Sequence, residues 1–156
     1  MFSGFFFYDF GGFFMERALN IAKYIISYCS KQGRPVSNLQ VQKILFFLQV
    51  KYYKAFGEWL FSDEIEAWPY GPVVRGVYDV FFGYGGSKID NIYECNINEE
   101  IKKFINPIIN ELSRKNPWQL VEQTHKKGGS WDTTFSQRGK YAIIDKDLIA
   151  KDINIL

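Results

Sequence analysis

Residues 35–57 read PVSNLQVQKILFFLQVKYYKAFG and carry the strongest local signals in the 156-residue chain. Ser37 is followed three residues later by Gln40, the spacing of a capping box in which each side chain bonds the other residue's backbone N–H. Gly57 comes directly after the pattern, where a left-handed residue commonly ends a helix. Phe46 and Phe47 add apolar side chains outside the main stripe, so this helix is apolar nearly all round. We therefore expect a helix over residues 38–56 at the centre of the fold.

Three polar side chains interrupt this apolar helix. Gln42 and Gln49 are seven residues apart and so lie on nearly the same side, with Phe46 between them and Lys43 at the edge of the row. Two interpretations of the amides are open. They either face water or hydrogen-bond the loop at residues 66–72, since a buried amide without partners costs roughly 1–3 kcal/mol.

Residues 62–81 read SDEIEAWPYGPVVRGVYDVF and combine aromatic rings with turn residues. We expect residues 59–61 and 64–68 to be short, forming either a small β-hairpin or two extended segments. A turn follows, because Pro72 forces Gly71 away from the helical region. Proline also suits the first position of a helix, so we expect a short helix to begin at Pro72.

Start and stop signals predict further helices on both sides of these segments. Residues 16–31 carry an apolar stripe of helical spacing. Asn98 and Asn116 are expected helix caps, and Asp145 is expected to cap a short final helix. Pro107 lies inside the helix that starts after Asn98, where we expect a kink or a division into two shorter helices.

These elements predict the fold class and the domain organisation. The fold is expected to be mostly α, a compact single-domain helical bundle with a small β-hairpin or extended element near residues 58–70. Residues 16–156 are expected to form the domain. Residues 1–15 are expected to be a non-structural N-terminal extension, because helical periodicity starts immediately after Met15. The alternative is a partner-binding tail.

Composition excludes several classes of function. A formal net charge of +2 argues against a basic nucleic-acid binder. No hydrophobic run reaches the roughly 20 residues that cross a membrane, so we expect a cytoplasmic protein with no membrane partner. Cys29 and Cys95 lie far apart and are expected to be reduced thiols, a disulfide or metal pair being the alternative.

Motifs of catalysis and cofactor binding are missing from the sequence. It contains no phosphate-binding loop, dinucleotide fingerprint, nucleophile elbow or HExxH zinc motif. His125 is the single histidine and could act as an acid–base group, but a helix-end histidine bonded to a carbonyl or carboxylate is the simpler interpretation. Glu64 and Glu66 share one face of a strand and could bind a metal, although solvation is the commoner role. We therefore expect no catalytic residue, metal or cofactor.

Aromatic rings are the most distinctive feature that remains. Trp59, Trp68, Tyr70, Tyr78 and Trp131 are of the types that supply interface hot spots. Each ring alone could belong to the core, but the cluster favours a contact surface. The Pro-Tyr-Gly-Pro turn would hold such rings with little conformational entropy left to lose on binding.

Five motifs follow one another in the sequence: LNIAKYII, VSNLQVQKILFFLQ, DEIEAWPYGPVVRGVYDVF, TH at 124–125 and a tryptophan at 131. In this order they resemble the Panacea domain, also called the SocA-like antitoxin domain. The resemblance covers residues 16–135. The family positions that it carries over are Leu39, Gln42, Lys43, Gln49, Glu66, Ala67, Trp68, Tyr70, Gly71, Pro72, Val73, Tyr78, Thr124, His125 and Trp131. We call these positions the signature residues and expect them to be structural, with partner contacts among them.

The resemblance implies a non-enzymatic antitoxin, which neutralises a cognate toxin by direct protein–protein binding. The alternative is a phage or mobile-element adaptor or inhibitor that binds a host machine, such as a protease or a defence complex. An enzyme that uses His125 is the third hypothesis. Nucleic acid is not expected as a partner.

Overall fold

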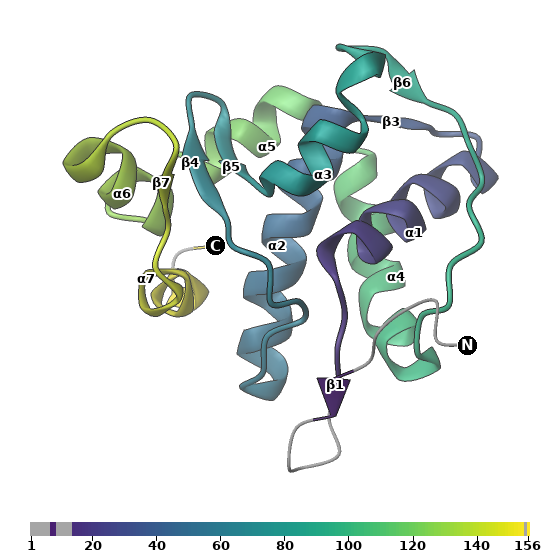
Figure 1. Ribbon diagram of the computed structural model, residues 1–156, viewed down its shortest axis with the longest axis horizontal. Helices are drawn as coiled ribbons and strands as arrows, with labels where there is room; N and C mark the ends of the chain where they lie inside the picture. Colours follow the sequence, from purple (N-terminus) through teal and green to yellow (C-terminus); the bar gives the residue numbers. More distant parts are fainter. Residues whose placement is uncertain (1–6, 9–13, 155) are drawn as a thin grey trace.

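The computed structural model describes residues 7–8, 14–154 and 156 (Figure 1). Its α-helices are α1 (Ala18–Lys31), α2 (Asn38–Phe56), α3 (Arg75–Val80), α4 (Glu99–Ser113), α5 (Pro117–Thr124), α6 (Ser130–Arg138) and α7 (Lys146–Lys151). Two 3-10 helices are η1 (Phe82–Tyr84) and η2 (Asp152–Asn154). Its strands are β1 (Phe7–Tyr8), β2 (Phe14–Met15), β3 (Val36–Ser37), β4 (Glu66–Trp68), β5 (Gly71–Val73), β6 (Lys88–Ile89) and β7 (Ala142–Ile143). Helices dominate and the strands are short, so the predicted mostly α fold class is confirmed.

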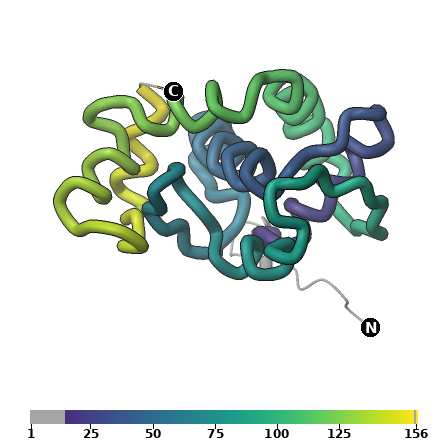
Figure 2. The backbone as a smooth tube through the Cα atoms, turned by 90° about the horizontal axis from the view of Figure 1, so that it is seen from above, coloured from purple at the N-terminus to yellow at the C-terminus, as the bar shows by residue number. Residues whose placement is uncertain are grey.

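Helix α2 lies at the centre of the molecule, with the rest of the chain wrapped around it (Figure 2). The predicted capping box is present: Gln40 N donates to Ser37 Oγ at 3.3 Å, and Ser37 N donates to Gln40 Oε1 at 3.0 Å. Gly57 ends the helix with a φ of 67°. Every residue from 41 to 50 is buried, so the polar side chains in this run need partners inside the protein.

The predicted hairpin forms one strand further along the chain than expected. Strand β4 pairs with β5 in antiparallel register, Trp68 opposite Gly71, and β7 pairs with the other edge of β4. Residues 59–61 are therefore not the partner strand. The prediction of a helix starting at Pro72 is also wrong, because Pro72 lies in β5 and α3 begins at Arg75. Proline fits β5 because this is an edge strand, where the missing N–H is tolerated.

Local cap signals locate the other helix starts correctly. Asn98 Oδ1 accepts from Glu100 N at 2.8 Å at the start of α4, and Asn116 forms a capping box at the start of α5. Asp145 precedes α7, although its side chain makes no cap hydrogen bond. The expected division at Pro107 does not occur, since α4 continues to Ser113. Pro107 is exposed, and the buried isoleucines on the opposite face of α4 pack against α2, which stabilises the helix across the proline.

Helix α6 is missing from the sequence predictions because a distant residue holds its first turn. Asp152 is buried in η2 and accepts from Ser130 N at 2.8 Å. The Ser130 hydroxyl donates to the other Asp152 oxygen. Burial raises the pKa of Asp152, and these two bonds from Ser130 oppose the rise. A cap supplied from this distance leaves no local pattern in the sequence.

Most of the predicted N-terminal extension, residues 1–6 and 9–13, lies outside the described residues. Strands β1 and β2 pair with each other in antiparallel register. Glu16 then makes a parallel bridge with Phe61, and its N–H donates to Leu60 O at 3.0 Å. Glu16 thus links the start of the chain to residues 60–61.

Two further observations concern the predictions from composition. Cys29 is buried, Cys95 is half-buried, and both are free thiols. Within residues 7–8, 14–154 and 156, no helix has the length and apolar character needed to cross a membrane.

Candidate functional site

The polar side chains of α2, Gln42, Lys43 and Gln49, hydrogen-bond the β4–β5 hairpin and the chain on both sides of it. Gln49 Nε2 donates to Phe61 O at 2.8 Å, and Gln49 Oε1 accepts from Leu60 N at 2.9 Å and from Phe61 N at 3.2 Å. Gln42 Oε1 accepts from Val74 N at 2.9 Å. Both amides are buried, so the interpretation that they face water is wrong. Their hydrogen bonds reach the segments on either side of the loop at residues 66–72, and Lys43 is the α2 side chain that bonds the loop itself.

Lys43 contacts the hairpin from α2, which packs against β5. Its side chain is fully buried, and Nζ donates to Pro72 O at 2.8 Å. Burial lowers the pKa of Lys43 to about 7. Gly71 allows this approach, because a Cβ on Gly71 would stand 2.8 Å from Lys43 Cε and 2.8 Å from Thr124 Oγ1. Lys43, Gly71 and Thr124 thus meet at one point, although they lie far apart in the sequence.

His125 and Trp131 hold the other side of the hairpin. Their rings stack with centroids 3.7 Å apart and an interplanar angle of 3°. Trp131 Nε1 donates to Trp68 O at 2.8 Å, which links α6 to β4. Burial, followed by the charge of Lys43, lowers the pKa of His125. In the part of the chain that the structure describes, no group of three His, Cys, Asp or Glu side chains could hold a metal ion.

The structure separates the signature residues into a buried set and an outer set. The buried set holds the hairpin from inside and cannot be reached by a partner of the folded protein; it comprises Gln42, Lys43, Gln49, Ala67, Gly71, Pro72, Val73, Thr124 and Trp131. Leu39 and His125 are half-buried beside this set. The outer set comprises Glu66, Trp68 and Tyr78, which are half-buried, and Tyr70, which is exposed.

Four aromatic rings cover the outer side of the hairpin, and we call them the ring row: Phe82, Tyr78, Trp68 and Tyr141. The Trp68 ring centroid lies 4.7 Å from that of Tyr78 and 5.2 Å from that of Tyr141. The Tyr78 centroid lies 5.8 Å from that of Phe82. The row thus runs across α3, the hairpin and the turn before β7, which lie next to one another (Figure 1). Phe82 and Tyr141 at its two ends are exposed.

A network of hydrogen bonds fixes the middle of the ring row. Arg75 donates to Glu66 through Nε at 3.1 Å and through Nη2 at 2.9 Å, and Trp68 Nε1 donates to Glu66 at 3.0 Å. The Arg75 guanidinium also lies 5.1 Å from the Trp68 ring centroid. These donors bind the Glu66 carboxylate, whereas Glu64, its partner in the metal interpretation, is exposed and lines a different part of the surface. These contacts link Trp68 on β4 to Arg75 at the start of α3 through Glu66.

A second exposed pair of rings lies at the tip of the hairpin. Tyr70 and Trp118 meet edge to face with centroids 5.3 Å apart, and both are exposed. Trp59 and Trp131 do not contribute to either surface. Trp59 stacks on Tyr53 with centroids 4.1 Å apart, and Trp131 is buried.

Sequence reasoning missed Phe82, Trp118 and Tyr141. Phe82 stands before a glycine-rich segment, and Trp118 follows a helix-starting proline, so each is inconspicuous in the sequence. Tyr141 has a φ of 68°, which places its ring against Trp68 from a turn. Only the return of β7 to the sheet brings Tyr141 to the hairpin.

The fold and this surface define a class of small, mostly helical domain in which buried polar side chains hold a rigid, ring-covered hairpin. The family model described as "Antitoxin SocA-like, Panacea domain" matches residues 41–132, more than half of the chain, and the chain belongs to this family. The predicted family is therefore confirmed.

One curated relative supports this assignment. The chain is 28% identical over 125 residues to "Antitoxin SocA" of Caulobacter vibrioides, a match that covers 72% of this chain and 66% of that protein. The chain thus spans slightly less than two thirds of the relative's length. No solved structure matches the chain.

Proposed function

We propose that this protein is an antitoxin that neutralises a cognate toxin by binding it directly, without catalysis, and that the ring row is the surface that contacts the toxin. Membership of the SocA-like antitoxin family is the observation that carries the proposal. The arrangement of the signature residues supports it, since they hold the hairpin and display rings on its outer side.

Physical arguments favour the ring row as the contact surface. Tyrosine and tryptophan dominate interface hot spots because each buries a large area with few rotatable bonds. Here Glu66 and Arg75 hold the central Trp68 ring, and buried Lys43 of α2 holds the hairpin that carries it, so little entropy is lost on binding. The ring row and the neighbouring Tyr70–Trp118 pair could together supply much of the about 800 Å² that each partner buries in a standard interface.

The proposal predicts that the adjacent gene encodes the toxin, and co-expression of that gene product with this chain tests it. The wild-type chain should restore growth, whereas a double variant with Phe82→Ala and Tyr141→Ala should fail to do so while accumulating as a folded protein. Phe56→Ala is the matched control, because Phe56 is 52% exposed and Phe82 is 64% exposed, but Phe56 lies at the far end of α2.

The amount of toxin in the same cells separates two mechanisms. Direct neutralisation leaves the toxin level unchanged, whereas a fall in toxin that depends on the antitoxin would indicate delivery to a protease. Growth rescue that survives the ring-row double variant would contradict the proposed contact surface.

A further inference from the structure

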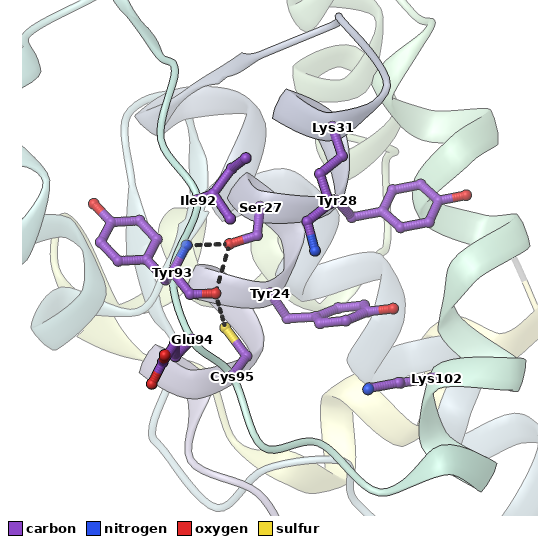
Figure 3. Close-up of a pocket in the computed structure, with 9 residues that line it drawn as sticks. All are labelled: Tyr24, Ser27, Tyr28, Lys31, Ile92, Tyr93, Glu94, Cys95 and Lys102. Atoms are coloured by element: carbon purple, nitrogen blue, oxygen red, sulfur yellow. Dashed lines mark hydrogen bonds between the residues drawn. The ribbon is translucent and has the colours of Figure 1, made fainter.

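A groove of about 400 Å³ lies between α1, the segment at residues 92–95 and the first turns of α4 (Figure 3). Tyr24, Tyr28 and Lys31 line it from α1, and Lys102 lines it from α4. This volume is within the range of ligand-binding pockets. The groove is built by elements other than those of the ring row.

The wall formed by residues 92–95 is fixed in place before any ligand binds. Ser27 Oγ accepts from Tyr93 N at 2.7 Å and donates to Lys23 O at 2.8 Å. Ser30 Oγ accepts from Asn91 N at 3.1 Å in the same way. Two serines of α1 therefore bind the neighbouring segment, as Figure 3 shows for Ser27. A preformed groove loses little entropy when it is filled.

Two lysines line this groove, Lys31 and Lys102, and a third, Lys23, lies beside its Tyr93 wall. Lys23 Nζ lies 5.7 Å from the Tyr93 ring centroid, and Lys102 Nζ lies 5.8 Å from the Tyr24 ring centroid. The side chain of Lys31 runs along the groove toward Ser27 (Figure 3). Burial raises the pKa of the Cys95 thiol, and the charges of all three lysines oppose that rise. The three ammonium groups therefore all lie close enough to Cys95 to stabilise a negative charge there.

Local carboxylates do not neutralise this charge. Glu94 also lines the groove, and Glu99 pairs with Lys102 at 3.2 Å. The Glu99 side chain is 78% exposed, and an ion pair of this kind contributes little and is readily exchanged for another. One cation in excess over the local carboxylates remains, beside the Tyr24 and Tyr28 rings and the exposed apolar side chain of Ile92.

We propose that this groove binds an acidic segment of a protein partner, with carboxylates at Lys31 and Lys102, the charge of Lys23 nearby, and an apolar side chain against Tyr24 and Ile92. An acidic peptide supplies both kinds of group along one strand, which matches the mixture of cations, rings and an exposed isoleucine. Electrostatic complementarity of this kind favours binding and selects partners by charge. The inference needs no toxin and does not rest on the proposed function.

Fluorescence anisotropy with a short labelled peptide of Glu, Asp and Leu residues tests this inference on the full chain. The double variant Lys31→Gln with Lys102→Gln should bind the peptide about tenfold more weakly. The control is Lys54→Gln with Lys103→Gln, which makes the same change of net charge at lysines outside the groove. Binding should also weaken as salt screens the lysines.

Alkylation of Cys95 by N-ethylmaleimide locates the peptide independently of the lysine variants. Cys95 lines the groove and is half-buried, whereas Cys29 is buried in the core, so the uncharged reagent reports on the groove. Bound peptide should slow the reaction of Cys95.

The inference would be overturned if the protein bound the acidic peptide no more tightly than a peptide with Lys in place of Glu and Asp. Equal losses of peptide affinity in the groove variant and in the control variant would also overturn it. So would protection of Cys95 from alkylation by inorganic triphosphate but not by the peptide. This last outcome would make the groove a site for small anions.

Discussion

Replacing Gly71 by alanine tests how the signature residues hold the hairpin. Gly71 has a φ of +110°, a conformation that L side chains rarely adopt, and an added Cβ would stand 2.8 Å from both Lys43 Cε and Thr124 Oγ1. Backbone strain of this kind costs about 1–3 kcal/mol, and overpacking of a filled site costs about as much again. The lower entropy of the unfolded chain returns about 0.4–1 kcal/mol. Gly71→Ala should therefore lower the free energy of unfolding by roughly 2–5 kcal/mol.

Denaturant unfolding followed by tryptophan fluorescence measures this loss, with Gly76→Ala as the matched control. Gly76 lies in α3, where an added Cβ would meet no atom within 4 Å, and the alanine variant should gain up to about 1 kcal/mol. Combining Gly71→Ala with Thr124→Ala removes one of the two clashes and should recover part of the loss. A Gly71→Ala variant as stable as the wild type would refute the close contact beneath the hairpin.

Burial lowers the pKa of Lys43 to about 7 in the folded protein. Between about pH 7 and 10 the unfolded chain therefore binds more protons at this residue than the folded chain does. The free energy of unfolding of the wild type should rise across this range, by up to about 1.4 kcal/mol per pH unit. Lys43→Met should lose this rise in unfolding titrations, and equal pH dependence in both proteins would contradict it. Gln49→Leu leaves the buried Leu60 and Phe61 backbone groups unpaired and should lower the free energy of unfolding by roughly 2–5 kcal/mol in the same assay. The control Gln137→Leu changes an exposed glutamine and should shift stability by less than about 0.5 kcal/mol. A chain that starts at Met15 should still neutralise the toxin in co-expressing cells, and loss of rescue by a folded, truncated protein would show that residues 1–14 take part in binding.

Local signals in the sequence predicted the elements that local contacts create. The capping boxes at Ser37 and Asn116 place donors and acceptors three residues apart, so α2 and α5 were located correctly. Most of the signature residues are buried around the hairpin in the structure. The order of the signature in the sequence identified the family that the chain belongs to.

The errors arose where a distant residue decides the local structure. Gln49 on α2 binds the backbone at Leu60 and Phe61, which removes residues 59–61 from the expected hairpin. Asp152 supplies the cap of α6 from 22 residues away, so no pattern near Ser130 announces that helix. The ring row likewise depends on the return of β7 to β4, which places Tyr141 against Trp68. None of these contacts can be inferred from spacing along the chain.

The affinity of the purified chain for its toxin is the decisive measurement for the proposed antitoxin function. Titration calorimetry should detect a complex with the wild-type protein and binding about 30-fold weaker or worse with Phe82→Ala, the loss expected when a hot-spot ring is removed. The exposed Phe56→Ala control should bind as the wild type does. Wild-type affinity in the Phe82→Ala and Tyr141→Ala variants would contradict the ring row as the contact surface, and no binding by the wild-type chain itself would contradict the antitoxin function.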